Sequence, residues 1–504
     1  MSLLALHPAI SENLLLLALC VAFAGVAVTY NIWQNSVRIS RLPPGPPGNR
    51  LAVGPRAWLQ YDEWAKKYGP VYSFRNGSAI VVVLATYEAA VDIMQKHGND
   101  LADRPPSIAA GKLLSGDMRT LLVGSGERLR RLRRALHSQL QPSIAKQYAG
   151  LQTMHAKNYV RDILNSPEHF LEHGRTYAAS VIMNLTYGKT SRTKYSDPVI
   201  RELNRNLLRL SHALGLGSYL VDTFPFLRFI PLGGVAELKQ FHKEELSLFK
   251  AQVELAKERV SRSEANASFA TYLLEHQKEY GLSDDELAYL AGSMFGAGSD
   301  TTAAGLGFVI MAAAVHPDEW AKVQAQIDEV VGRQRLPSFE DQSALTRVTA
   351  FVHEAHRWRT ITPGAFAHRA TKDIFWRDYV IPEGAIVIGN HWSVMHDPAV
   401  FPDPYTFKPD RWINREGNIR DDLKHFDFGY GRRVCVGQYV AERSLFINTA
   451  LVAWSFNIHQ DPEKPIDTFG FTDGSIVHPS PFAVRFEARG GKDRVLEALD
   501  AEMD

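Results

Sequence analysis

The sequence predicts a mainly α-helical protein with small β-sheets, of the α+β class, preceded by one N-terminal transmembrane helix. Three observations favour this fold class. An apolar segment of membrane-spanning length lies near the N-terminus, helical periodicity dominates most long segments after residue 85, and short strand-like runs occur toward the two ends of the chain. Many helices with small, segregated sheets are typical of α+β proteins.

The composition is that of a globular protein and argues against some functions. The 504 residues are 45% hydrophobic and 22% charged, which is ordinary usage with ample material for a large core. The formal net charge of +1 argues against general nucleic-acid binding, so we expect no nucleic-acid partner. The two cysteines, Cys20 and Cys435, provide neither a disulfide framework nor a zinc site, and a reducing compartment fits them.

The first element is an apolar segment, Leu14–Trp33, with about the 20 residues that a spanning helix needs and no charge. Arg38 and Arg41 follow it, whereas the preceding side has Glu12 and neither Lys nor Arg, so the positive-inside rule places the rest of the chain in the cytosol. The alternative is a cleaved signal peptide, which would have a basic start and a shorter apolar core. We predict a retained membrane anchor over residues 1–41.

A proline-rich segment, LPPGPPG at residues 42–48, follows the predicted anchor. It cannot be helical and favours extended polyproline geometry, so we interpret it as a stiff hinge between the anchor and a globular body. An irregular loop inside the body is the alternative. No internal repeat is found after residue 50, and a single large domain over residues 49–504 is therefore expected.

Strand signals stand near both ends of this body. In the run Pro70–Ala85, Asn76-Gly77 is a strong hairpin-turn signal between two β-rich stretches. Further signals occur around Ile374–Ile388 and in GSIVHPSPFAVRF at residues 474–486. The segments between them are mostly of helical period.

One predicted helix is unusual. It opens at Ser283 with Glu286 three residues later, a capping-box pattern, and stops at His316-Pro317. About 32 residues predict a length of roughly 48 Å, and an apolar surface nearly all round predicts burial. Its middle, AGSDTT at residues 297–302, consists largely of poor helix formers. Such a conflict favours a functional site, the alternative being a water-filled kink without chemistry.

The next candidate is an acid–base pair, Glu354 and Arg357, spaced i, i+3 on a predicted helix and close enough for an ion pair. Alone the pattern is weak, because most such pairs are solvated surface pairs. Arg411, in FKPDRW, is a candidate third member.

The last candidate is the stretch FGYGRRVCVG, which contains the only cysteine outside the N-terminal apolar segment, Cys435. Gly431 and Gly437 flank it and allow a tight loop. A helical run follows, so the helix N-terminus and the two preceding arginines predict a lowered pKa for the thiol. The thiolate could ligate a metal or act as a nucleophile with His425 as base, although no Cys/His/Asn signature appears, and an inert buried cysteine is the third alternative.

Together these motifs resemble the cytochrome P-450 monooxygenases, and the anchor and hinge resemble the microsomal, eukaryotic members, of fungal type. The motifs stand in the family's order, and the resemblance covers residues 1–490. The family's ten-residue haem-binding signature is matched at all its fixed places, by Phe428, Gly431, Arg433, Cys435 and Gly437. Its oxygen-activating helix motif is matched by Ala297, Gly298, Asp300 and Thr301. Its structural triad is matched by Glu354, Arg357 and Arg411.

The resemblance implies a cytochrome P-450 fold and a haem b cofactor whose iron is ligated by Cys435. Asp300 and Thr301 are the implied catalytic pair that relays protons to dioxygen. Where the family often has a tryptophan four residues before the propionate-binding arginine, this chain has Leu129, while Arg133 remains. The other implied haem contacts are Arg433, His368, Arg133, Arg130, Phe428 and Gly437.

The implied function is insertion of one atom of O2 into a lipophilic small molecule, by hydroxylation or epoxidation. NADPH would supply electrons through NADPH-cytochrome P-450 reductase, with cytochrome b5 as a second candidate donor, at the endoplasmic reticulum membrane. The arginine-rich run RLRRLRRALH is the implied reductase-docking helix, the alternative being a solvated helix face. A reductase-independent haem-thiolate isomerase or dehydratase, and a non-catalytic haem sensor, are the rival functions.

By the same resemblance the substrate pocket lies at the loop of residues 103–122 and at three further segments, 294–295, 362–366 and 475–477. These three contain no Arg or Lys, so we expect a lipophilic substrate, such as a terpenoid or aromatic compound, in secondary metabolism or xenobiotic oxidation. The implied pocket residues are Met294, Phe295, Ala365, Phe366 and Ile476.

Overall fold

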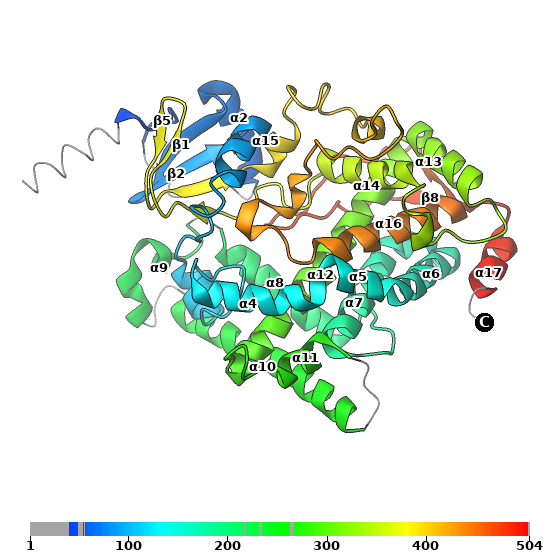
Figure 1. Ribbon diagram of the computed structural model, residues 1–504, viewed down its shortest axis with the longest axis horizontal. Helices are drawn as coiled ribbons and strands as arrows, with labels where there is room; N and C mark the ends of the chain where they lie inside the picture. Colours follow the sequence, from blue (N-terminus) through cyan, green and yellow to red (C-terminus); the bar gives the residue numbers. More distant parts are fainter. Residues whose placement is uncertain are drawn as a thin grey trace, which may run out of the picture.

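The computed structural model describes residues 40–48, 54, 56–215, 217–230, 234–262 and 267–501. The predicted anchor helix at residues 14–33 lies outside the described residues. Within them, one helix, α12 (Asp284–Val315), is long and apolar enough to cross a membrane, and it is mostly buried inside the protein. The described residues are mainly helical with small sheets, as predicted, and the sheets among them are three (Figure 1).

The largest sheet joins strands from distant parts of the chain in the order β1-β2-β6-β3. The predicted hairpin is confirmed: β1 and β2 are antiparallel, with Asn76 opposite Ala79. β2 then pairs in parallel with β6, and β6 pairs antiparallel with β3. The strands of this sheet are β1 (Val71–Asn76), β2 (Ala79–Leu84), β3 (His368–Arg369) and β6 (Ile386–Gly389).

The proline-rich hinge is attached to this sheet instead of standing free of the body. The backbone N–H of Ser73 donates to the carbonyl of Pro44 at 2.9 Å, and its hydroxyl donates to that of Pro43 at 2.6 Å. A Cβ on Gly45 would lie 1.7 Å from the Ser73 carbonyl oxygen, so only glycine fits this approach.

Two further sheets have two strands each, β4 (Ile374–Trp376) with β5 (Tyr379–Ile381) and β7 (Phe456–Gln460) with β8 (Val484–Ala488). The strand signal at residues 474–486 is wrong for its first ten residues, which form a loop. Pro479 and Pro481 lie in that loop, and proline cannot donate to a sheet ladder.

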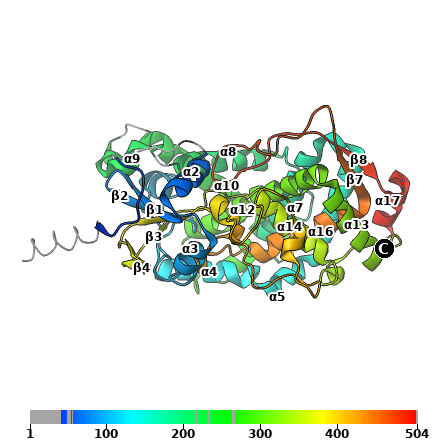
Figure 2. The ribbon, with the colours of Figure 1, turned by 90° about the horizontal axis from the view of Figure 1, so that it is seen from above.

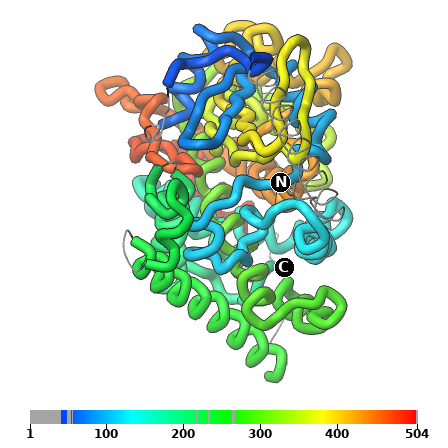
Figure 3. The backbone as a smooth tube through the Cα atoms, turned by 90° about the vertical axis from the view of Figure 1, so that its left-hand side faces the viewer, coloured from blue at the N-terminus to red at the C-terminus, as the bar shows by residue number. Residues whose placement is uncertain are grey.

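Helices form the rest of the body, and Figure 3 shows the strand-rich part, in blue and yellow, on one side of the cyan and green helices. The longer helices are α4 (Glu127–Leu140), α6 (Ala149–Asn165), α7 (Phe170–Tyr187), α8 (Pro198–Ala213), α10 (Val235–Ser261), α12, α13 (Pro317–Val330), α14 (Thr346–Trp358) and α16 (Gln438–Ser455). The shorter ones are α2 (Ala57–Tyr68), α3 (Tyr87–Ala89), α5 (Pro142–Ala145), α9 (Leu220–Thr223), α11 (Phe269–Glu275), α15 (His391–Met395), α17 (Lys492–Asp500), the π-helices η1 (Ala90–Gln95) and η2 (Ile108–Leu114), and the 3-10 turns η3 (Lys146–Tyr148), η4 (Pro167–His169), η5 (Pro225–Phe229), η6 (Phe339–Asp341), η7 (Pro409–Trp412), η8 (Phe426–Phe428) and η9 (Gly431–Arg433).

The predicted long helix is confirmed as α12, which runs through the middle of the body (Figure 2). Its capping box is formed: the Ser283 hydroxyl accepts from the Glu286 N–H at 3.1 Å, and the Glu286 carboxylate accepts from the Ser283 N–H at 3.2 Å. α12 packs against α7, α10, α14 and α16. Because it is the common neighbour of these helices, α12 holds its middle residues at the centre of the core.

Candidate haem-thiolate site

The cysteine loop is closed by main-chain hydrogen bonds. The Cys435 N–H donates to the Phe428 carbonyl at 2.9 Å, and α16 begins directly after Gly437. Gly431 has φ +51°, and a Cβ there would lie 2.7 Å from the Met94 carbonyl oxygen. Glycine is therefore required at residue 431 by both its backbone and its neighbour, and the loop is held rigidly ahead of α16.

The thiol of Cys435 is surrounded by protein and yet keeps an exposed surface. The sulfur therefore faces an opening inside the protein. Burial raises the pKa of the Cys435 thiol, outweighing the Gly437 N–H and the charge of Arg133, which lower it. The predicted lowering is thus wrong for the free thiol, because burial penalises the thiolate more than its neighbours stabilise it.

The middle of α12 has a similar opening. Ala297 is exposed, although the helix on either side is buried, and Thr301 lies four residues on, on the same face. The Thr301 hydroxyl donates to the Ala297 carbonyl at 2.8 Å. Because α16 packs on α12, the loop before α16 and this face of α12 can border one internal site.

A cluster of cations lies beside the cysteine loop. Arg433 donates to the carbonyls of Ala102 and Val123 at 2.6 and 2.5 Å, and Arg133 donates to that of Val434 at 2.8 Å. Arg104 donates to the carbonyls of Phe366 and Ala367 at 2.9 and 2.6 Å. All three guanidinium groups therefore bond to neutral oxygens.

Burial, followed by the charges of Arg433 and Arg133, lowers the pKa of Arg104 to about 9. Burial, followed by the charge of Arg133, lowers the pKa of Arg433 to about 10, and Asp103 offsets both shifts only in part. Burial, followed by the charge of Arg104, lowers the pKa of His368 to about 3, and its Nδ1–H donates to the Leu101 carbonyl at 2.6 Å. A dianionic group would relieve this excess of buried positive charge.

Haem b fits these residues. Its two propionates would complement Arg104, Arg133 and Arg433, and its iron would bind the accessible sulfur of Cys435, since a coordinated thiol is deprotonated whatever its free pKa. Among the described residues, no group of three or more His, Cys, Asp or Glu side chains could hold a metal ion.

One predicted haem contact, Arg130, stays a prediction, and another residue of the cation cluster was missed. Arg130 is exposed on α4, three residues before Arg133. Arg104, by contrast, belongs to the cluster but was not predicted. Its only signal was an arginine before two prolines in a loop without periodicity. Leu129 is buried in α4.

Glu354 is the centre of a buried network. The guanidinium of Arg357 donates to both its oxygens, at 2.8 and 2.9 Å, and Arg411 donates at 3.1 Å. The Trp412 indole and the Lys408 backbone N–H also donate to it, at 2.9 and 2.8 Å. The side chains of Glu354 and Arg357 are 0% exposed, so the network holds α14 against the segment that carries η7.

Two of the predicted pocket residues lie on α12, and their role stays a prediction. Met294 and Phe295 are buried in the main core, and the Phe295 ring packs edge-on against Tyr187 at 5.7 Å. Met294 lies three residues before Ala297 and seven before Thr301, so it shares their face of α12, whereas Phe295 is about 100° further round the helix.

The other predicted pocket residues, Ala365, Phe366 and Ile476, are half-buried in loops, and their role stays a prediction. Ala365 has φ +54°, a conformation that residues other than glycine rarely adopt and that tends to occur at functional sites.

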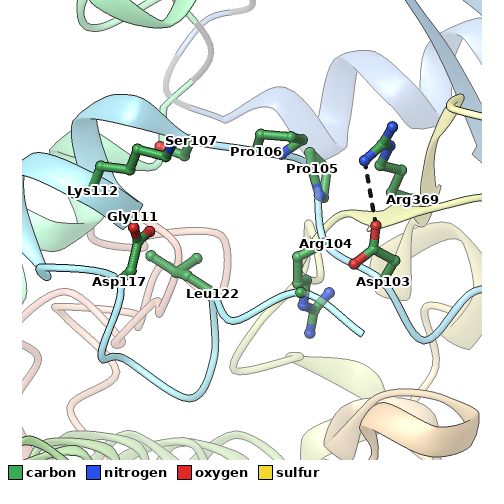
Figure 4. Close-up of a pocket in the computed structure, with 11 residues that line it drawn as sticks. Asp103, Arg104, Pro105, Pro106, Ser107, Gly111, Lys112, Asp117, Leu122 and Arg369 are labelled. Carbon is green, nitrogen blue, oxygen red and sulfur yellow. Dashed lines mark ion pairs between the residues drawn. The ribbon is translucent and has the colours of Figure 1, made fainter. Parts of the chain in front are cut away.

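The loop of residues 103–122 borders a pocket of about 210 Å³. Figure 4 shows Asp103 and Arg369, an ion pair at 3.5 Å, on one side of it, with Arg104 turned away from Arg369. The lining residues are Asp103, Arg104, Pro105, Pro106, Ser107, Gly111, Lys112, Asp117, Leu122, Gly124 and Arg369.

Comparison with known proteins agrees with this site. The cytochrome P-450 family model matches residues 43–486. Cytochrome P-450 monooxygenase 64 of Postia placenta is 53% identical over 460 residues, which cover 90% of this chain and 93% of that protein. Monooxygenase 113 of the same fungus is 50% identical over 494 residues, covering 97% and 99%. A cytochrome P-450 monooxygenase of Armillaria gallica is 33% identical over 504 residues, covering 96% and 95%.

A mainly helical body with an accessible loop cysteine beside buried arginines has the features of a haem-thiolate protein. The chain belongs to the cytochrome P-450 family. It is a monooxygenase of that family, with fungal relatives, and the predicted resemblance and enzyme class are confirmed.

Proposed function

We propose that this monooxygenase inserts one atom of O2 into a lipophilic small molecule by hydroxylation or epoxidation, using two NADPH electrons delivered by NADPH-cytochrome P-450 reductase. The observation that carries the proposal is the accessible sulfur of Cys435 within the protein, beside the Arg104, Arg133 and Arg433 cluster. When bound, the haem supplies the electron transfer and O–O cleavage, while the protein supplies orientation and protons.

The substrate class is proposed from the lining. The segments 362–366 and 475–477 contain no Lys or Arg, and the open face of α12 carries Ala297 and Thr301. An apolar, uncharged compound fits such a lining better than an anion. Secondary metabolism or xenobiotic oxidation fits both this lining and the fungal relatives.

The proposed function is tested by a binding and turnover screen. Lipophilic ligands are added to the purified holoprotein, shifts of the haem spectrum identify binders, and mass spectrometry identifies products. We expect oxygenated products only when both NADPH and reductase are present. Product formation without reductase would instead indicate an isomerase or dehydratase, and binding without any product a haem sensor.

The electron donor is proposed to dock near α4. Arg130 and Arg134 are exposed there, and Arg432 is exposed on the cysteine loop. Arg128, however, is paired with Glu286 at 2.8 Å, so the basic surface is smaller than the five arginines of the sequence indicate. Complementary charge would steer an acidic reductase domain to it, with cytochrome b5 as a second candidate.

The protein is proposed to associate with the endoplasmic reticulum membrane, with its catalytic domain in the cytosol, and an aromatic cluster supports a membrane contact. Phe226 and Phe229 are 61% and 76% exposed in η5, next to α9, and Phe375 is exposed in β4. Figures 1 and 2 both place α9 and the β4–β5 hairpin at the same end of the long axis. Large exposed apolar residues gathered at one end are typical of a contact with a membrane or a partner.

We expect the full chain to sediment with membranes and deletion of residues 1–41 to release only part of it, because the aromatic cluster still binds lipid. Adding Phe226→Ser and Phe229→Ser to the deletion should release the rest, with haem content unchanged. The control carries Leu255→Ser and Val260→Ser, which alter exposed residues of α10. Fractionation measures each, and equal pelleting of the two double variants would contradict the proposal.

Asp300 and Thr301 are proposed to move protons to the open face of α12. Thr301→Ala removes a hydroxyl and introduces a better helix former, so haem content and substrate binding should stay close to those of the unmodified protein. More of the consumed O2 should leave as hydrogen peroxide and less as product, which an NADPH, peroxide and product balance measures.

General acid–base groups contribute about 10²–10⁴-fold to rates, so Asp300→Asn should slow turnover at least roughly tenfold. Thr302 is the control, since it is buried and about 100° away around the helix. Equal uncoupling by Thr301→Ala and Thr302→Ala would show local destabilisation of the helix in place of proton delivery.

A further inference from the structure

The carboxylate of Asp300 is bonded to a residue that the sequence did not single out. The Nε2 of His478 lies 2.9 Å from Asp300 Oδ1. Because the acceptor is a carboxylate, Nε2 carries the hydrogen and donates it. No hydrogen bond joins Asp300 to Thr301 among those described, since the Thr301 hydroxyl donates to Ala297.

The loop of His478 holds the imidazole in place. Its N–H donates to the Thr472 hydroxyl at 2.9 Å, and its carbonyl accepts from the Thr472 N–H at 3.0 Å. The adjacent Val477 N–H donates to the Ile361 carbonyl at 2.9 Å. His478 is thus fixed by its own main chain against the centre of α12.

The pair is only partly buried. The His478 side chain is 14% exposed and that of Asp300 is 25% exposed. Imidazole has two ring nitrogens, and with Nε2 engaged by Asp300, Nδ1 is the one available to exchange a proton with water. A proton taken up at Nδ1 and another released from Nε2 to Asp300 Oδ1 leave the ring neutral, with one proton moved inward.

We propose that His478 is the outer residue of the proton path, taking protons from solvent and passing them to Asp300, which supplies the Thr301 face. The inference rests on the proposed role of Asp300 and Thr301. The opposing view is structural: His478 would only tie its loop to α12. The two differ in whether the imidazole must transfer a proton or merely donate a hydrogen bond.

His478→Gln separates these roles, because the amide can donate to Asp300 but cannot carry a proton, whereas His478→Ala loses both abilities. Both variants should lower turnover by roughly tenfold, less than the usual 10²–10⁴-fold acid–base contribution because water can replace the ring. Both should also increase the solvent deuterium isotope effect. The carbon-monoxide spectrum and substrate affinity should not change, which shows that the fold and pocket are intact.

His459→Gln is the matched control, since His459 also pairs with a carboxylate, that of Glu487 at 3.3 Å, on the exposed β7–β8 sheet. It should behave like the unmodified protein. The variant Asp300→Asn/His478→Gln should be no slower than Asp300→Asn alone, because removing two members of one path is not additive. Multiplied effects would show separate paths and overturn the proposal.

A readout independent of turnover tests the contact itself. In ¹⁵N-histidine spectra of the holoprotein, the signal that disappears in His478→Gln identifies the resonance of His478. This resonance should shift in Asp300→Asn, whereas the resonance of His459 should not. Normal turnover in His478→Gln with slow turnover in Asp300→Asn would overturn the relay and leave Asp300 in place. Normal turnover in Asp300→Asn would overturn the proposed role of Asp300, and the His478 inference with it.

Discussion

Cys435→Ser is expected to abolish the red-shifted Soret band of the reduced carbon-monoxide complex. That band reports a thiolate on the iron, and a serine hydroxyl cannot supply one. Haem content should also fall, since only the cation cluster would still hold the cofactor. The measurement is the reduced difference spectrum, together with the haem-to-protein ratio.

The fold should survive this substitution. The loop is closed by the main-chain bond from the residue 435 N–H to Phe428, which serine keeps, and Gly431 still provides the tight backbone. Circular dichroism should therefore match that of the unmodified protein. Cys20→Ser, at the only other cysteine, is the control and should keep the band. A Cys435→Ser protein that retains the band would disprove the ligand assignment.

Where sequence reasoning succeeded, the signals were local. The capping box at Ser283 and the stop at Pro317 set both ends of α12, and Asn76-Gly77 set the β1–β2 hairpin. Each depends on residues within a few positions of one another, so a single sequence contains the whole signal.

The failures depended on packing between distant segments. The pairing of β2 with β6 crosses about 300 residues, and the Asp300–His478 bond joins α12 to a loop that the sequence had suggested as a strand. Arg104 was missed because only the structure brings it beside Arg433.

The pKa of the Cys435 thiol also depends on packing that the sequence does not reveal. From sequence, the helix N-terminus and nearby arginines were the only terms, and they lower the pKa of Cys435. The structure adds burial, which is the larger effect and has the opposite sign. Burial cannot be summed from neighbours in sequence, because it depends on the packing of the whole fold.

The second large effect is expected at the Glu354 network. Glu354→Ala leaves the Arg357 guanidinium buried with no counter-charge beside it and removes the acceptor of the Trp412 indole. Breaking a buried pair in this way costs about 3–5 kcal/mol, comparable to the lower end of a domain's whole stability of roughly 5–15 kcal/mol. We expect little haem-loaded protein from Glu354→Ala, and equally little from Arg357→Ala.

Arg357→Lys should fail as well, because the two bonds from Arg357 to Glu354 and its bond to the Met395 carbonyl, at 3.0 Å, need the guanidinium fork and not a point charge. The control is Arg420→Ala: Arg420 also makes a two-bond pair, with Asp422 at 3.0 and 2.6 Å, but on the surface, where such pairs contribute about 0–1 kcal/mol. Holoprotein yield and thermal unfolding measure all four variants. If the two alanine variants at 354 and 357 gave holoprotein as readily as Arg420→Ala, burial of the pair would not be what holds α14 in place.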